Sequence, residues 1–443
     1  MTVALIKTKA EQALFQRFES DVASLPGTGW VTKLRRDAMA KFESQGLPHR
    51  RVEEFKYTDL RDRLKEIPLP ARASERPVSK VDINAALGPL AGLDLIRIVL
   101  LDGRYNALLS DFPEAEAGIE LFPLSAMLAK APDWLAGKFT PERTGRDDAV
   151  AALNLAFMTD GVMLKAKAGT TVTRAVAIIS VSSSGAPETV TERNIVSIEA
   201  GAKLTLIEAQ IALAGAAAGG HRNVATDVDI AAEAELRHIK CVAQAGAPTQ
   251  LSQWRVRIGS EATYRGFQLT AGTATARNDI HIAFTGPDAK LDLSGAFLGP
   301  GHDHIDTTLV VDHSTPGCES RELFKGVLDG RARGVFQGKI IVQPIAQKTD
   351  GKQMSQALML SEDAEFDSKP ELEIYADDVA CGHGATAAEL DADMLFYLMS
   401  RGIPRAEARA MLIESFVGEA IDKVDDEAIR EALMEIARAW LKA

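Results

Sequence analysis

Hydrophobic residues near the start of the chain recur with the period of amphipathic helices. Two such segments precede residue 46, and Pro26-Gly27 separates them. Their apolar positions are Leu14, Phe15, Phe18 and Val22, and then Val31, Leu34, Ala38 and Phe42. A short buried strand is predicted at Leu95–Leu101 and a further helix at Asp147–Phe157. The N-terminal region, residues 1–145, is therefore predicted to be helical or mixed.

From about Gly161 the pattern changes to short alternating strands, and the chain begins to repeat itself. Three clear copies are Ile198–Leu204 (IEAGAKL), Ile230–Leu236 (IAAEAEL) and Ile258–Tyr264 (IGSEATY). More divergent copies run over Phe284–Leu291, Val327–Val335 and Leu360–Phe366. The alanines that mark the six copies are Ala202, Ala234, Ala262, Ala289, Ala332 and Ala364. Most separations are close to about thirty residues, a spacing typical of solenoids.

This repeat favours a β-helix. One strand–turn–strand unit cannot bury its apolar face, whereas stacked units build a continuous core. A β-sandwich also alternates and turns, and it remains the alternative on pattern alone. The Ala/Gly stretch Ala212–Gly220 is interpreted as a loop between turns of the helix. The predicted β-helix core covers residues 146–386.

After Gly384 the helical period returns. Helices are predicted at Asp393–Arg401, at Pro404–Ile421 and after the acidic residues Asp425–Glu427, which suit a helix N-terminus. On the helix from Pro404, Leu412 and Phe416 widen the apolar stripe more than packing on the β-helix requires. We therefore predict that residues 387–443 form a helical domain that contacts a partner.

Composition limits the class of function. The chain has 443 residues and a net charge of −12, which disfavours a general nucleic-acid role. Cys241, Cys318 and Cys381 are too few and too widely spaced for a disulfide framework, so a reducing compartment is expected. The first ten residues contain two lysines and no apolar core of a secretory signal, and no apolar run is long enough to span a bilayer. These observations predict a cytoplasmic protein.

The strongest candidate site is the pair Cys381-Gly-His383, at the join between the strands and the C-terminal helices. A thiolate and an imidazole two residues apart can both reach one soft metal ion or cluster iron. Asp377 and Asp378 add possible oxygen ligands or hydrogen-bond acceptors. Spacing alone leaves the alternative open, because buried cysteine usually serves as a small hydrophobic residue.

A second group, His302, His304 and Asp306, would share one face of a strand. A polar face or turn is the favoured interpretation, ahead of a metal site. Cys318 follows a turn signal and is expected to be structural, and Cys241 and His238 occupy repeat positions. The chain has no phosphate-binding P-loop, dinucleotide fingerprint or nucleophile elbow.

Four longer motifs carry a resemblance to a known family. They are Arg51–Thr58 (RVEEFKYT), Glu319–Gly326 (ESRELFKG), Gly334–Lys339 (GVFQGK) followed by Gln347–Asp350 (QKTD), and Glu373–Thr386 (EIYADDVACGHGAT) continuing into Leu395–Ile403 (LFYLMSRGI). The chain resembles the SufB/SufD family of iron–sulfur cluster assembly proteins from about Arg51 to its C-terminus, and the last motif resembles the SufD branch. Phe55 stands where the family usually has Trp, and Ala387–Glu389 departs slightly from the pattern.

The resemblance implies a right-handed parallel β-helix flanked by helical N- and C-terminal regions. It implies a non-catalytic scaffold that pairs with a SufB-like subunit and binds a SufC-like ATPase through its C-terminal helices, with Leu412 and Phe416 as contact residues. Cys381 and His383 match the SufD cysteine and histidine implicated in a transient iron–sulfur cluster at the SufB interface. Sulfur delivery is assigned to the partner, and no flavin-binding signature is visible. Alone, the chain is expected to be capable of homodimerisation.

Two other functions remain open. One is a carbohydrate-active β-helix enzyme, with His302, Asp303 and Asp306 as acid–base groups. Aromatic residues make up only 6% of the chain, few for a sugar-binding cleft. The other is a plain homodimeric structural protein. Co-purification of an ATPase would distinguish a scaffold from either.

Overall fold

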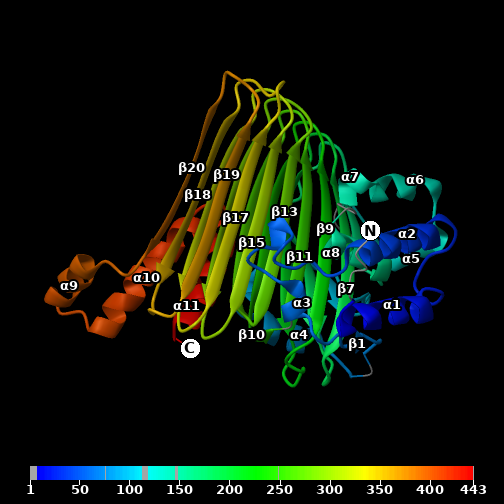
Figure 1. Cartoon of the computed structure of the whole chain (residues 1–443), viewed down its shortest axis with the longest axis horizontal. Coiled ribbons are helices and arrows are strands. Elements are labelled where there is room, and N and C mark those ends of the chain that lie inside the picture. The colour runs from blue at the N-terminus through cyan, green and yellow to red at the C-terminus, as the bar shows by residue number, and fades with distance from the viewer. Residues whose placement is uncertain (1–6, 75, 112–117, 145–147, 248, 443) are drawn as a thin grey trace, which may run out of the picture.

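The central body is a parallel β-solenoid of about seven turns, in which successive strands alternate between two facing sheets (Figure 1). The computed structural model describes residues 7–74, 76–111, 118–144, 148–247 and 249–442. From Val162 onward each strand pairs in parallel with the strand two places along the chain, which places every turn of the solenoid directly above the last. The predicted β-helix is confirmed, and the β-sandwich alternative is wrong.

Within the described residues, each sheet contains ten strands. Sheet A has the order β19 (Glu365–Ile374), β17 (Arg333–Val342), β15 (His304–His313), β13 (Thr275–Phe284), β11 (Thr249–Ile258), β9 (His221–Ile230), β7 (Glu188–Ile198), β5 (Val162–Ala166) and β4 (Ile119–Pro123), with β1 (Leu69–Pro70) beside β7. Sheet B has the order β20 (Ala380–Ala388), β18 (Asp350–Met359), β16 (Glu319–Leu328), β14 (Lys290–Gly299), β12 (Thr263–Thr273), β10 (Glu235–Ala247), β8 (Lys203–Ala212), β6 (Ala175–Ser182), β2 (Leu95–Leu101) and β3 (Arg104–Tyr105). The strand predicted at Leu95–Leu101 and the loop between β8 and β9 are thereby confirmed.

The marker alanines lie in the turns between the sheets. Ala202, Ala234, Ala262 and Ala289 are buried in the turns from sheet A to sheet B. The residue before each of the last three has a positive φ of 56° to 60°, and glycine takes this place before Ala202. The residue before each alanine thus adopts a left-handed backbone conformation, and the alanine that follows supplies the small side chain that the tight turn requires. Ala332 and Ala364 lie in the opposite turns, from sheet B to sheet A, so the repeat read from the sequence combined two kinds of corner.

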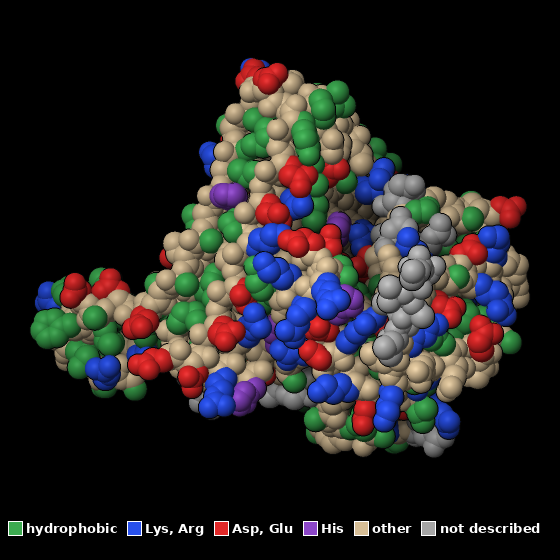
Figure 2. All heavy atoms as spheres, viewed as in Figure 1, with side chains coloured by type: hydrophobic (Ala, Val, Ile, Leu, Met, Phe, Trp, Pro, Cys, Tyr) green, Lys and Arg blue, Asp and Glu red, His purple; other side chains and the backbone are tan. Residues whose placement is uncertain are grey.

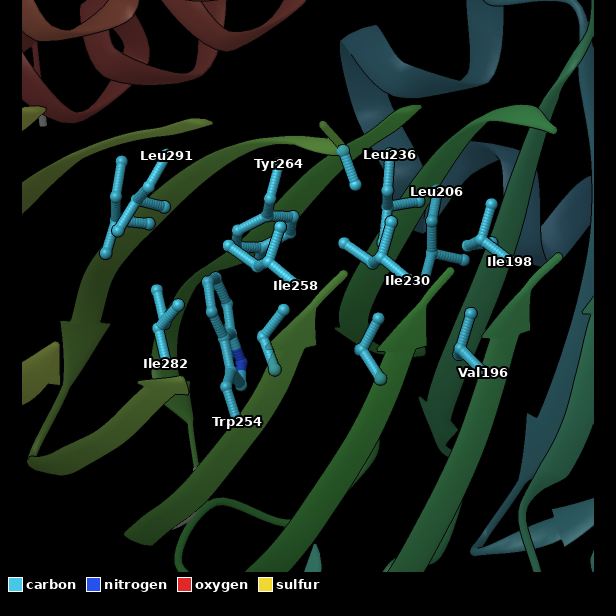
Figure 3. Packing of buried hydrophobic residues seen from close by; sticks show 14 of the residues in the cluster. Val196, Ile198, Leu206, Ile230, Leu236, Trp254, Ile258, Tyr264, Ile282 and Leu291 are labelled. Atoms are coloured by element: carbon cyan, nitrogen blue, oxygen red, sulfur yellow. The ribbon is translucent and has the colours of Figure 1, made fainter. Parts of the chain in front are cut away.

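The space between the sheets is filled by inward-facing side chains of both sheets. Figure 3 shows aliphatic residues from successive strands stacked in columns, with Trp254 and Tyr264 among them. All the labelled residues are at most 3% exposed. At about 25 cal/mol per Å² of apolar surface, this burial is the main stabilising term of the solenoid.

N-terminal helices cover the outer face of sheet A at one end of the solenoid (Figure 1). They are α1 (Lys9–Asp21), α2 (Trp30–Gln45), α3 (Leu60–Arg63), α4 (Lys80–Leu87), α5 (Leu124–Lys130), α6 (Asp133–Ala136), α7 (Pro141–Thr144) and α8 (Ala149–Phe157), with short 3₁₀ turns η1 (Glu53–Phe55), η2 (Gly88–Gly92) and η4 (Gly137–Phe139); α4 and η2 lie on sheet B instead. The helix expected at Asp147–Phe157 is α8, which begins at Ala149, and residue 147 lies outside the described residues. Buried Arg35 of α2 donates to the carbonyl oxygens of Pro26 and Ala156 and so joins the two halves of this layer.

Three C-terminal helices follow β20: α9 (Ala392–Ser400), α10 (Arg405–Ile421) and α11 (Glu427–Lys442). Helices α10 and α11 cover the outer face of sheet B, where Ile413, Val417 and Leu433 are buried against the strands. Helix α9 projects away from the body (Figure 1). The three predicted helices are therefore present, but only two of them pack on the solenoid.

The two ends of the solenoid differ. At the N-terminal end, sheet A finishes in the antiparallel pair β4–β5 and sheet B in the antiparallel pair β2–β3. At the other end β19 and β20 are the outermost strands, and no further strand of the described chain pairs with them. The N–H and C=O groups along these two edges remain available to another chain.

Candidate functional site

Cys381 and His383 lie on β20, at the open end of the solenoid. Cys381 is in register with Gly351, and His383 with Gln353. Gly351 faces the interior, because a Cβ atom added to it would lie 3.5 Å from Ile340 Cδ1 of the opposite sheet, and alternation puts His383 on the same side. Cys381 is half-buried against the interior core, whereas His383 is exposed. Both side chains thus face the mouth of the solenoid.

The environment of Cys381 favours the neutral thiol. Burial raises the pKa of Cys381, and the carboxylates of Asp350 and Glu322 raise it further. A metal ion binds the thiolate and displaces its proton, so this cysteine would become a ligand when a cation arrives.

The chain supplies only part of a metal site here. Across residues 7–442, apart from the gaps given above, no group of three His, Cys, Asp or Glu side chains is arranged to hold a metal ion. An iron–sulfur cluster is usually held by four protein ligands. Cys381 and His383 therefore provide two soft donors that need further ligands from elsewhere.

Asp377 and Asp378 are brought close to Cys381 but not toward its side chain. Both are exposed in the turn before β20. The carboxylate of Asp378 pairs with Lys348, and its backbone N–H donates to Gln347 Oε1. Asp378 is thereby held by Lys348 and Gln347 within this turn.

Two polar residues behind His383 were missed from the sequence. Glu322 on β16 is in register with Gln353 on β18, and both are 3% exposed. Burial raises the pKa of Glu322 to about 8. Glu322 lies in the motif at Glu319–Gly326, but the sequence alone does not show which face of the sheet its side chain is on. The register between β16 and β18 supplies that information.

An open cavity of about 670 Å³ reaches the same edge of sheet B. Cys381 and His383 are among its lining residues, together with Arg321 and Lys352 from the strands and Lys423 from the α10–α11 connection. Alternation puts Arg321 and Lys352 on the outer face, opposite to Glu322 and Gln353. The strand that carries Cys381 is therefore accessible from both faces.

His304 and Asp306 come together, but around Thr58 of the N-terminal motif. Thr58 Oγ1 lies 2.8 Å from His304 Nε2 and also donates to Asp306. Arg277 donates to the same carboxylate at 2.5 Å and stacks on Phe55, with its guanidinium 3.9 Å from the ring centroid. All these groups are buried, and burial lowers the pKa of His304 to about 3. The cluster anchors the N-terminal motif on sheet A.

His302 does not join this cluster. It is exposed in the turn before β15, beside Arg331 and Arg333. The other two cysteines are buried: Cys318 occupies a turn and Cys241 packs under the C-terminal helices. Their predicted structural positions are confirmed.

The C-terminal helices distribute their apolar residues differently from the sequence interpretation. Phe416 is half-buried toward sheet B, with Lys325 Nζ 4.4 Å from its ring centroid, and Lys325 also pairs with Glu419 at 2.6 Å. Leu412 is half-exposed. The exposed apolar surface lies instead on α9, at Met394, Phe396 and Tyr397, and hydrophobic side chains are visible on this projecting segment in Figure 2.

Among the helices of the described chain, none combines the length and apolar character needed to cross a bilayer. The fold and the site together define a class: a β-solenoid protein with one capped end, one open end that presents a cysteine and a histidine, and a helical arm beside it.

Comparison with known proteins narrows this class to one family. Residues 179–416 match the family model "SUF system FeS cluster assembly, SufBD core domain", and residues 8–178 match "SufBD protein N-terminal region". The chain belongs to the SufBD family of iron–sulfur cluster assembly proteins. It is 29% identical to the iron–sulfur cluster assembly protein SufD of Escherichia coli over 88% of both chains. It is also 26% identical to an iron–sulfur cluster assembly SufBD family protein of Synechocystis, over 96% of this chain and 94% of that one.

Proposed function

We propose that this chain is a SufD-type scaffold subunit that pairs with a SufB-like subunit and turns over no substrate of its own. The observation that carries the proposal is the position of Cys381 and His383 on the unpaired edge strand β20. Two soft ligands at an open end suit a site that a second subunit completes. The SufD of E. coli, similar over most of its length, bears a name that assigns it to the same assembly process.

The proposed contact with the SufB-like subunit is strand pairing at β19 and β20. Each edge offers a row of backbone donors and acceptors, and exposed Ile374 and Tyr375 add apolar surface where β19 ends. The partner's strands would extend both sheets and bury the mouth of the solenoid. Iron and sulfide, the cargo of the reaction, would then meet Cys381 and His383 beside ligands from the partner, which also receives the sulfur.

The proposed contact with the SufC-like ATPase is the helical arm. Phe396 is 73% exposed and Met394 50% exposed, and Met411 of α10 is also exposed. Aromatic residues dominate interface hot spots, so Phe396 is the principal anchor in this proposal. Leu412 remains a proposed contact, while Phe416, packed on Lys325, connects α10 to the strands beneath it.

The test is the stoichiometry of complexes formed in vitro, measured by analytical ultracentrifugation. The chain alone should form a monomer or a weak homodimer, and it should form a heterodimer when a SufB-like subunit is added. A SufC-like ATPase should add one further copy on this subunit. A chain that stays monomeric with both partners would contradict the proposal. The proposed site of action is the cytoplasm.

A further inference from the structure

The interior face of sheet B carries a short column of polar side chains that ends at His383. Glu322 is in register with Gln353, and Gln353 with His383. Neighbouring strands lie about 4.8 Å apart, so adjacent side chains in this column are within hydrogen-bonding reach. Further along the same column stand Leu293 and Gly266, so the polar section begins at Glu322.

The hydrogen-bonding groups of this column are not satisfied within the described part of the chain. Both amide atoms of Gln353 and both carboxyl oxygens of Glu322 are buried and make no well-formed hydrogen bond there. Burial raises the pKa of Glu322, and this effect outweighs that of the nearby Ser320 hydroxyl, which lowers the pKa. Buried polar groups without partners are rare in native proteins, and each one calls for an explanation. Within the column, the polar neighbours of Gln353 are Glu322 on one side and the imidazole of His383 on the other.

The opposite sheet leaves room for the amide of Gln353. A Cβ atom added at Gly338 of β17 would lie 2.3 to 2.5 Å from the amide atoms of Gln353. Gly338, in the motif at Gly334–Lys339, therefore permits the amide of Gln353 to occupy the interior of the solenoid, on the strand next to that of His383.

We propose that Gln353 is a positioning residue for His383, held in turn by Glu322. Gln353 Nε2 donates to a carboxyl oxygen of Glu322, which leaves Oε1 to accept the N–H of one ring nitrogen of His383. The other ring nitrogen then keeps its lone pair and faces the open end. Metal-binding histidines almost always donate their second ring N–H in this way, which fixes the tautomer and the ring orientation. This inference rests on the ligand role proposed above for His383.

The test uses the whole chain with its eight histidines labelled with ¹⁵N, and His383→Ala to assign the ring signals of His383. The parent should show His383 in one hydrogen-bonded tautomer. In Gln353→Leu the balance between tautomers should move about fivefold toward that of free imidazole, the effect of one typical hydrogen bond. Gly338→Ala, which displaces the amide but keeps Gln353, should shift the signals in the same direction.

Gln356→Leu is the matched control, because Gln356 is on the same strand but on its outer face, in register with Lys325 and Thr386. It should leave the His383 signals unchanged. Identical signals in the parent and in Gln353→Leu would overturn the inference.

Cluster assembly separates this inference from the proposed function. In complex with the SufB-like subunit, Gln353→Leu should assemble clusters at least 10-fold more slowly, the usual loss for a residue that orients a metal ligand. A parent rate in Gln353→Leu together with a slow His383→Ala would overturn the positioning role alone. A parent rate in His383→Ala would overturn the proposed ligand role, while the ring signals would still decide whether Gln353 holds the ring.

Discussion

Phe416 and Phe396 differ in what their side chains contact, and this difference yields a sharp prediction. Phe416 is half-buried on sheet B above Lys325, whereas Phe396 is 73% exposed on α9. Truncating a fully buried phenylalanine costs about 3–5 kcal/mol, so the half-buried ring should account for about 2 kcal/mol. Loss of the cation–π contact with Lys325 adds roughly 0.5–1 kcal/mol. We therefore expect Phe416→Ala to lower the free energy of unfolding by about 2.5–3 kcal/mol.

The assay is urea unfolding followed by circular dichroism, combined with titration of the SufC-like ATPase. Phe416→Ala should unfold at a clearly lower urea concentration. Phe396→Ala should unfold within about 0.5 kcal/mol of the parent, as exposed positions usually do. It should also bind the ATPase about 30-fold more weakly, the loss expected for a hot spot of about 2 kcal/mol. Unfolding of Phe416→Ala at the parent urea concentration, with weakened ATPase binding only in that variant, would refute the reasoning and restore Phe416 as the docking anchor.

Three further predictions concern the solenoid. Thr58→Val removes the hydroxyl that contacts His304 and Asp306, and it should cost about 1–3 kcal/mol in urea unfolding. Ala289→Leu overfills a buried corner and should cost about 1–3 kcal/mol, whereas Ala364→Leu, in a half-buried corner, should cost less in the same assay. Glu322→Gln tests the raised pKa of Glu322: the folded parent holds this proton from near pH 4.5 up to about 8, so its stability falls as pH rises through that range. The advantage of Glu322→Gln over the parent should therefore be larger at pH 8 than at pH 5, and an equal difference at both pH values would contradict it.

The β-helix could be predicted from the sequence because its physics is local and repeated. Each turn needs a small residue at a tight corner and alternating apolar residues on either side, and both requirements recur about every thirty residues. Helices α1, α2, α10 and α11 were found for the same reason, since each carries one apolar stripe, whereas the short helices α3 to α7 were not predicted. The pattern did not distinguish the turns from sheet A to sheet B from the turns in the opposite direction. Ala289 lies in a turn of the first kind and Ala332 in one of the second, and both positions require a small side chain.

The candidate site was less accessible to sequence reasoning. Cys381 and His383 were identified as a pair by their spacing and by a family motif, but the neighbours of His383 depend on strand register. Gln353 and Glu322 are 30 and 61 residues away in sequence, and only parallel pairing brings them into one column. Thr58 likewise meets His304 only after the N-terminal segment has folded back across sheet A.

The most direct test of the central claim is the rate of cluster assembly in the complete complex of this chain with its SufB-like and SufC-like partners, under anaerobic conditions with iron and a sulfide donor. The parent, Cys381→Ser, His383→Ala and the control His302→Ala, altered in an exposed turn, are compared by absorbance and Mössbauer spectroscopy. Cys381→Ser and His383→Ala should assemble clusters at least 10-fold more slowly while forming the complex normally, and His302→Ala should match the parent. Assembly at the parent rate by both Cys381→Ser and His383→Ala would contradict the claim that the open end of this solenoid holds the nascent cluster.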